Sequence, residues 1–415
     1  KIASTFNIML INKKNKSLNV NLMLSFIVFS MLLNSMSIII LQLSQNAQHT
    51  YTGLGILEFF KDIPIALVSI FLVDYIKKKS YYLSLAFALF ICTICSFSIP
   101  FLTEFWFLKI WFILIGISFS IGKICVFSII KNTTETEKEF SITMSRTEAA
   151  FMLGIFIVNM EFALILSSDY QEFWRFGFWL VGFISLWTGI QIIRHHHTHK
   201  NTEPIPVKKS KIDFTILLNK SSLLFLAIIS LIIFAEQIFN SWLPTFYKKS
   251  LNSSSFFALQ SSALLAFFSF LGRIIASKLI HRFSPMKIFY TSLISGIILI
   301  SSAFFIGQES DLKIKILMFI FPLIGFFIAP LYPMLNSKFL GNYPEKKISR
   351  MVSFIILFTS LGGSIGSIST AYIFQKNLAN YYLLFASIPL ILILILSSLF
   401  SIKERMSINK NDHET

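Results

Sequence analysis

Polar side chains that could bind a solute are gathered in one otherwise apolar stretch of this 415-residue chain, FAEQIFNSWLPTFY. The stretch contains Glu236, Gln237, Asn240 and Trp242. Asn240 follows Glu236 by four residues and Gln237 by three, so in a helix it lies one turn from both. Hydrogen-bonding edges beside a flat aromatic ring suit a pyranose, although they suit many other small polar molecules as well.

A second group of ionisable residues has helical spacing. Glu58, Lys61 and Asp62 stand at positions i, i+3 and i+4, which lie on one face of a helix. One interpretation is a salt-bridged face that neutralises itself inside the protein. The other is a functional site, because Pro64 soon afterwards predicts a local kink that frees backbone carbonyl groups.

Three further ionisable residues stand inside apolar segments. Lys123 and Glu148 lie in segments that follow each other in the sequence, and an unpaired charge in such surroundings is costly, so we expect the two to pair. The pair could be structural, or it could be broken and remade during function. Glu161 has no evident partner, which predicts a carboxyl group that burial keeps neutral and that can carry a proton.

The elements that must position these residues are membrane-spanning helices. The chain is 55% hydrophobic and only 13% charged, which excludes an ordinary soluble domain. Twelve apolar runs are each long enough to cross about 30 Å of hydrocarbon as a helix. We place these runs at 19–44, 53–75, 81–101, 105–130, 144–167, 174–194, 221–247, 255–281, 286–307, 313–338, 348–375 and 379–402.

The sequence therefore predicts an all-α membrane protein with twelve transmembrane helices. The alternating segments of an outer-membrane β-barrel are absent. In this setting Trp242 and Tyr247 have a second interpretation, as members of the aromatic belt at the membrane surface.

The distribution of basic residues predicts the orientation. If the N-terminus is cytoplasmic, 26 of the 36 Lys and Arg residues lie on the cytoplasmic side and 6 on the opposite side. This is the positive-inside pattern, so both termini are expected in the cytoplasm. The net charge of +16 then reflects topology and anionic lipid, and we expect no nucleic-acid partner.

The longest polar segment, RHHHTHKNTEPIPVKKSKIDFT, divides the twelve spans into two groups of six. It predicts an N-terminal six-helix bundle at 1–194, a cytoplasmic linker at 195–220, a C-terminal six-helix bundle at 221–402 and a cytoplasmic tail at 403–415. The four histidines of the linker are expected to be solvated rather than bound to a metal, since no carboxylate or thiol cage is nearby.

Two turns about half a chain apart support a duplication of six helices: FLVDYIKKKSYYLSL and SKLIHRFSPMKIFYTSL. Their characteristic residues are Asp74, Lys77, Lys78 and Lys79 in or beside the first turn, and Gly272, Arg273 and Arg282 in or beside the second. These residues resemble the cytoplasmic-turn signature of the major facilitator superfamily. The first copy departs from it, with Val68 and Ser69 where a glycine is usual.

FAEQIFNSWLPTFY, FIAPLYPMLNS and SLGGSIGS resemble more narrowly the fucose permease branch of sugar–cation symporters. The resemblance implies a secondary active transporter of a bacterial inner membrane that moves a small polar solute by alternating access. Proton-coupled import of a sugar is the leading expectation. The alternatives are an organic anion or siderophore, a drug-type efflux substrate and, more distantly, a channel.

Several expectations are negative. The chain has no GxxxxGK[ST] phosphate loop, so ATP-driven export is not expected. It has no HExxH or comparable catalytic set, and we expect no enzyme activity, no metal and no cofactor. The expected partners are the solute, a coupling proton and the lipid bilayer, with the protein acting as a monomer.

The resemblance also implies that the first, fourth, seventh and tenth helices line a central cavity, which adds Asn34 and Asn336 as weaker candidates. Related symporters carry embedded acids in the first and fourth helices, where this chain offers Asn34 and Lys123. Coupling would then rest on one of four other acids: Asp62, Glu148, Glu161 or Glu236.

Glycine and proline positions predict where helices approach closely or bend. Gly362, Gly363 and Gly366 would allow another helix to come close to the eleventh span. Three prolines, at 322, 330 and 333, interrupt the tenth span and suggest flexible gating.

Overall fold

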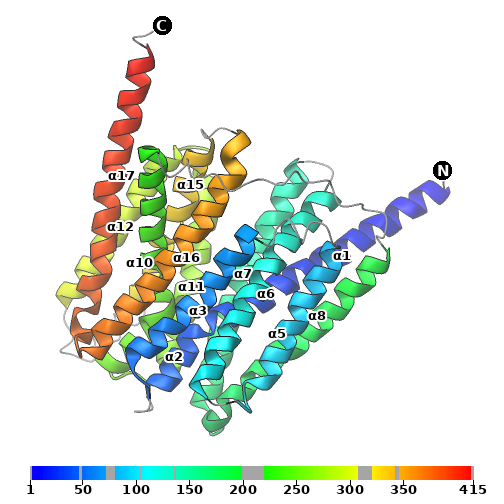
Figure 1. Ribbon diagram of the computed structural model, residues 1–415, viewed down its shortest axis with the longest axis horizontal. Helices are drawn as coiled ribbons and strands as arrows, with labels where there is room; N and C mark the ends of the chain where they lie inside the picture. The colour runs from blue at the N-terminus through cyan, green and yellow to red at the C-terminus, as the bar shows by residue number, and fades with distance from the viewer. Residues whose placement is uncertain are drawn as a thin grey trace. The chain divides into compact units, whose positions relative to one another are not determined.

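The computed structural model describes residues 2–45, 49–71, 80–102, 104–134, 137–198, 219–306, 320–341 and 345–412. Within these residues every regular element is a helix, as Figure 1 shows. The chain divides into two compact units, of which the first comprises Lys1–Met36 with Ile63–Lys209 and the second comprises Ser37–Asp62 with Ser210–Thr415.

The first unit is built on α1 and α5. Its helices are α1 (Ile2–Asn34), the last part of α3 (Tyr51–Phe71), α5 (Tyr81–Ser98), α6 (Phe105–Thr133), α7 (Glu137–Ser167), the short 3-10 helix η1 (Gln171–Gly177) and α8 (Phe178–Thr198). α1 packs against α6, α7 and α8, while α5 packs against α6 and α8.

The second unit is built around α10. Its helices are α2 (Met36–Ser44), the first part of α3, α10 (Lys220–Ser250), α11 (Ser255–Leu279), α12 (Pro285–Ile306), η2 (Phe321–Leu323), α14 (Ile324–Ile328), α15 (Leu331–Gly341), α16 (Glu345–Gln375), η3 (Ala379–Tyr381) and α17 (Tyr382–Asp412). α10 packs against α11, α16 and α17.

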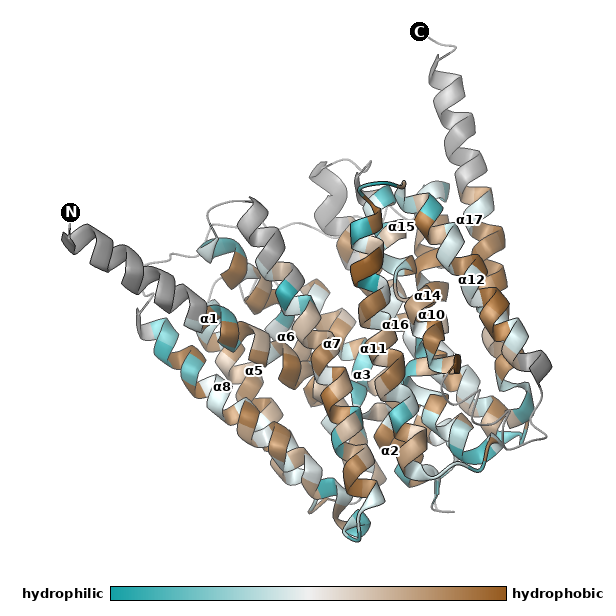
Figure 2. Cartoon of the chain, turned by 180° about the vertical axis from the view of Figure 1, so that it is seen from behind, coloured by the Kyte–Doolittle hydropathy of each residue, from teal (hydrophilic) through white to brown (hydrophobic). Residues whose placement is uncertain are grey.

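Each of the twelve predicted spans falls mainly on helix where the structure describes it. Within the described residues, ten helices are long and apolar enough to cross a membrane, and Figure 2 shows hydrophobic residues along most of their length. The second span, α3, is not among the ten because it carries Glu58, Lys61 and Asp62. The tenth is not among them because it is divided into η2, α14 and α15.

Two spans are broken, for identifiable reasons. The first span is interrupted at Ser35, between α1 and α2. In the tenth span, Ala329 and Pro330 form a turn between α14 and α15, because proline has no N–H to continue the helix. Pro322 and Pro333 lie in the first turns of η2 and α15, where no N–H is needed. The predicted interruption of this span is confirmed at Pro330 but not at Pro322 or Pro333.

α10 and α16 approach closely through the glycines of the eleventh span. A side-chain carbon at Gly362 would overlap the carbonyl oxygen of Ser230, and one at Gly366 would lie 2.7 Å from the carbonyl oxygen of Phe234. The prediction that these glycines allow close helix contact is confirmed.

The histidine cluster does not begin a solvated loop, because α8 continues to Thr198. His195 is 9% exposed and its Nε2 lies 3.2 Å from Nδ2 of Asn21 in α1. The Nδ1 atom of His196 lies 3.0 Å from Oγ of Ser80, just before α5. These two imidazoles therefore help to pack α8 against its neighbours, and the expectation of solvation was wrong for them.

Candidate functional site

Three charged side chains of α3 form a buried cluster in the second unit. Glu58 is fully buried and Lys61 is 8% exposed. The Lys61 ammonium forms an ion pair with Glu58 Oε1, and its Nζ lies 3.8 Å from Oδ1 of Asp62. The helical spacing of the three residues brings them together as the sequence suggested, and we call them the α3 triad.

The α3 triad is hydrogen-bonded to two other helices. Ser241 of α10 donates to Glu58 Oε2 at 3.2 Å, and Gln237 donates in turn to the Ser241 hydroxyl. Ser364 of α16 donates to Oδ2 of Asp62 at 3.3 Å. The result is a continuous polar chain from α10 through α3 to α16.

Gly363 makes room for the Asp62 carboxylate. A side-chain carbon at this position would lie 2.8 Å from Asp62 Oδ2, closer than such carbons normally approach an oxygen. The glycine therefore has a role beyond helix packing, because it lets α16 present its Ser364 hydroxyl to the carboxylate.

The charge of the α3 triad is unbalanced. Two carboxylates and one ammonium give a net charge of −1 when all three are ionised. A net charge inside a membrane protein is costly, and a buried carboxylate normally requires a compensating cation, hydrogen bonds or a proton. One bound proton would make the triad neutral.

The α3 triad stands at the end of the α3 segment that belongs to the second unit. Asp62 is the last residue of the α3 segment that belongs to the second unit, and Ile63 is the first that belongs to the first unit. Pro64 follows inside the same helix and removes one backbone hydrogen bond there. The charges are thus concentrated at the end of a segment, Ser37–Asp62, that packs as part of the second unit.

On α10, the predicted solute-binding residues differ in accessibility. Asn240 is exposed although it stands ten residues before the end of a long apolar helix. Glu236, one turn earlier, is partly buried, and its Oε1 is a buried atom with no hydrogen-bond partner among the described residues.

Trp242 has no ring face free for a solute. It is fully buried, its Nε1 donates to the Ser367 hydroxyl at 2.9 Å, and its ring stacks on Phe374 with centroids 5.4 Å apart. Tyr247 is fully buried as well. Both interpretations of Trp242, as a sugar platform and as part of a membrane-surface belt, are therefore corrected: its surface is used for packing α10 against α16.

Lys123 and Glu148 do not form the predicted pair. Both residues are described, and no ion pair joins them. Lys123 is exposed on α6, and its Nζ lies 5.8 Å from the ring centre of Phe119 and 5.6 Å from that of Phe127, one turn away on either side. Contacts with aromatic rings of its own helix replace the expected carboxylate.

The remaining candidates are scattered. Glu161 on α7 has a buried Oε2 with no hydrogen-bond partner in the described part of the chain, as has Oδ1 of Asn336 on α15. Asn34 donates from Nδ2 to the carbonyl of Ser30 on its own helix at 2.9 Å.

Of the two turn motifs, only the second lies wholly within the described residues. Asp74 and Lys77 to Lys79 lie outside the described residues. Gly272 and Arg273 lie inside α11 rather than in the turn that follows it, whereas Arg282 is exposed in that turn. Gly272 is a packing residue, since a side-chain carbon there would overlap the carbonyl of Phe326.

Sequence analysis missed the hydroxyl groups that connect the helices: Ser241, Ser364 and Ser367. Ser241 follows Gln237 by four residues, so the helical pattern that selected Gln237 could also have selected it. Nothing in the spacing of Ser364 or Ser367 signals a partner, because the partners lie on helices distant in sequence.

Comparisons with known proteins agree with this architecture. A crystal structure of a bacterial homologue of the human lysosomal transporter Spinster, inward-facing and unoccupied, superposes with a TM-score of 0.71 over 94% of this chain and 97% of its own, at 13% identity. The nucleoside transporter NupG gives a TM-score of 0.71 over 92% of this chain and 99% of its own, at 15% identity. These likenesses show a shared fold.

Sequence comparison assigns the family. A search of curated protein sequences gives no match. The family profile described as Major Facilitator Superfamily matches residues 18–367, which is most of the chain. This chain is a multi-pass membrane protein that belongs to the Major Facilitator Superfamily of transporters.

Proposed function

We propose that the protein is a proton-coupled secondary transporter that carries a small polar solute across a bacterial inner membrane by alternating access, in the direction of import. The observation that carries the proposal is the α3 triad, a buried cluster of net charge −1 at the end of a segment that packs as part of the second unit. The coupling proton is the one that neutralises it.

The physical argument rests on the cost of burial. A cluster that is negative when deprotonated is disfavoured in a membrane interior and is attracted to water or to a cation. Protonation of Asp62, whose Oδ1 lies farther from the Lys61 ammonium than Glu58 Oε1 does, removes the excess charge and favours the packed arrangement seen here. The equilibrium between packed and separated arrangements of Ser37–Asp62 therefore depends on proton binding, which is what coupling requires.

The proposed solute carries a sugar ring. The sequence resembles sugar–cation symporters, and a fold neighbour is a nucleoside transporter, whose solutes also contain a sugar. Asn240 supports a watery solute path, because an exposed amide in the interior of an apolar helix is favourable only beside water or a polar ligand. Glu236 and Gln237, on the same helix, supply the other hydrogen-bonding groups.

The test is uptake into proteoliposomes. Labelled hexoses and nucleosides are supplied outside, with or without an inward proton gradient, and a protonophore is the control for the gradient. We expect at least one solute to accumulate only when the gradient is present. Accumulation that does not depend on the gradient would contradict proton coupling. Unitary currents in planar bilayers would show that the protein is a channel rather than a carrier.

A second candidate solute is an organic anion, and Lys123 is the observation that favours it. Its ammonium is exposed on α6 and forms no ion pair with any described carboxylate. An exposed cation at such a position can meet an anionic group of a solute. In this case Lys123→Gln should abolish uptake of the anion, whereas uptake of a neutral sugar should persist in the variant if the sugar is the solute.

A further inference from the structure

A hollow separate from the α3 triad lies in the second unit, beside the turn that joins α11 to α12. Its volume is about 980 Å³, at the upper end of the range for small-molecule sites. Its walls come from the end of α11, the start of α12, α14 and α15, and none of its lining residues belongs to α3, α10 or α16. It is therefore not part of the candidate transport site.

The hollow lies at the level of lipid headgroups. α11 and α12 are both long and apolar enough to cross a membrane, and they are joined by the short turn between Leu279 and Pro285. Such a turn is located near one membrane surface, because each helix needs about 20 residues to cross the hydrocarbon. The α12 residues that line the hollow extend from Met286 to Ser295 and hence inward from that surface.

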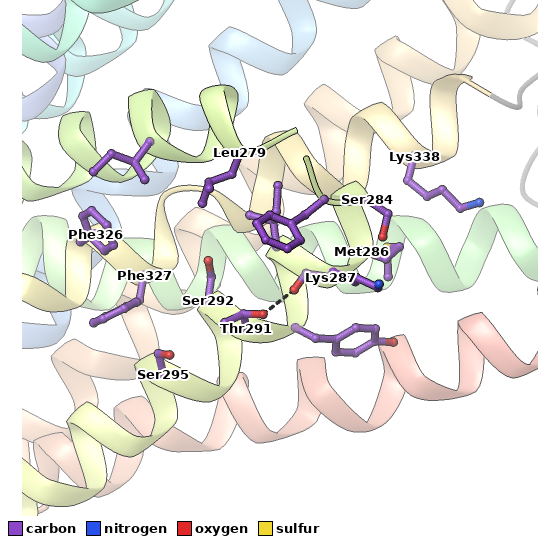
Figure 3. A pocket seen from close by; sticks show the side chains of 14 residues that line it. Leu279, Ser284, Met286, Lys287, Thr291, Ser292, Ser295, Phe326, Phe327 and Lys338 are labelled. Atoms are coloured by element: carbon purple, nitrogen blue, oxygen red, sulfur yellow. Dashed lines mark hydrogen bonds between the residues drawn. The ribbon is translucent and has the colours of Figure 1, made fainter. Parts of the chain in front are cut away.

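The two ends of the hollow differ chemically. Figure 3 shows Ser284, Lys287 and Lys338 at one end and Phe326 and Phe327 at the other. Among the described residues that line the hollow none is acidic, and its polar end carries the ammonium groups of Lys287 and Lys338. The opposite end is aromatic and offers no hydrogen-bonding side chain from α14.

Hydroxyl groups connect the two ends along α12. Thr291 and Ser295 are four residues apart in α12 and so share one helical face, while Ser284 immediately precedes the helix. From Pro285 to Ser295 the helix rises about 15 Å at 1.5 Å per residue. The Thr291 hydroxyl donates to the carbonyl of Lys287 at 2.7 Å. The neighbouring Ser292 lines the hollow as well.

We propose that this hollow binds an anionic glycerophospholipid. The phosphate group lies at Lys287, Lys338 and Ser284. The glycerol ester oxygens accept hydrogen bonds from the hydroxyls of Ser292 and Ser295, and an acyl chain lies against Phe326 and Phe327. A basic pocket between helices at the membrane surface is the kind of site that recognises anionic headgroups. A free phosphate ion would use the cationic end but leave the aromatic end empty.

The test compares lipids with identical acyl chains by native mass spectrometry of the full-length protein in detergent. Phosphatidylglycerol should be retained at least tenfold more strongly than phosphatidylcholine. Lys287→Gln and Lys338→Gln should each weaken phosphatidylglycerol binding about fivefold. Lys278→Gln is the matched control, because Lys278 is exposed at the end of α11 but is not among the residues that line the hollow. This variant should change binding less than twofold.

A second variant tests whether the inner part of the hollow holds an acyl chain, and a competition experiment tests whether phosphate alone can occupy the site. Ser295→Trp fills the inner part of the hollow without changing charge and should reduce retention of phosphatidylglycerol while the melting temperature stays within a few degrees. Inorganic phosphate at millimolar concentration should not displace the lipid. Equal retention of the two lipids, an equal effect of Lys278→Gln, or displacement by inorganic phosphate would each overturn the proposal.

Discussion

Ser241 of α10 donates a hydrogen bond to the Glu58 carboxylate of α3, with an Oγ–Oε2 distance of 3.2 Å between residues that are 183 positions apart in the sequence. This bond ties a buried ion pair of one helix to the most central helix of the second unit. Because Gln237 donates to the same hydroxyl, the bond also joins the α3 triad to the helix that carries the proposed solute-binding residues.

Removing the cation of the α3 triad should be more damaging than removing the ion pair. Lys61→Met leaves Glu58 and Asp62 buried with no compensating ammonium, and we expect a loss of about 3 kcal/mol in stability. The double variant Glu58→Gln, Lys61→Met should recover part of this loss. Thermal unfolding in detergent measures both. A double variant that is less stable than Lys61→Met would show that the charges do not compensate each other.

The hydrogen bond of Trp242 to Ser367 should be structural. Trp242→Phe and Ser367→Ala should each lower stability by about 1 kcal/mol, and the double variant should lose little more than either single one, since both remove the same bond. Solute affinity should stay unchanged in Ser367→Ala. A selective loss of affinity in a variant of normal stability would restore Trp242 to the binding site.

The fold was largely predictable from the sequence, because hydrophobic run length decides where a membrane helix forms. The described parts of the twelve spans are mostly helical, and the break at Pro330 follows from the missing N–H. Local spacing likewise brought Glu58, Lys61 and Asp62 together, since their contacts lie within one helix.

Contacts between helices were not predictable in the same way. The predicted Lys123–Glu148 pairing rests on two consecutive segments and the cost of an unpaired charge, whereas Lys123 lies among phenylalanines of its own helix. The environment of Trp242 depends on Ser367 and Phe374, more than a hundred residues away. Periodicity says which residues share a face but not which other helix that face meets.

The close packing at Gly272 leaves no room for a methyl group, so an alanine there should lower the stability of the protein. Gly272→Ala places a carbon against the Phe326 carbonyl, so α11 and α14 must separate, and we expect a loss of 1 to 3 kcal/mol, about the usual cost of overpacking. Gly296→Ala is the matched control, because a carbon there meets its nearest neighbours at 3.5 Å. Thermal unfolding of the two variants should differ clearly, and equal melting temperatures would contradict the packing argument.

Lys123 and Glu148 should act independently. With no ion pair between them, the effects of Lys123→Ala and Glu148→Ala on transport rate should add, within about 0.5 kcal/mol of apparent activation free energy. Uptake by both single variants and the double variant provides the cycle. Recovery of activity in the double variant would show a pairing that forms at another stage of transport.

Glu236 should be required for solute movement and not for folding. Glu236→Gln keeps the size of the side chain and removes a buried carboxylate whose Oε1 has no hydrogen-bond partner among the described residues, so stability should be equal or higher. Uptake should nevertheless be abolished if this group binds the solute. Asn240→Ala should raise the apparent KM, and normal uptake in both variants would exclude this face of α10 from the path.

The most direct test of the central claim is proton movement driven by solute. Liposomes that contain the protein and a trapped pH-sensitive dye are mixed with a transported solute at equal pH inside and outside. The wild-type protein should acidify the lumen as solute enters, while Asp62→Asn should exchange solute in counterflow without acidification. Asp169→Asn, at an exposed turn, should behave as wild type. Acidification by Asp62→Asn equal to that of the wild type would contradict the assignment of the coupling proton to Asp62.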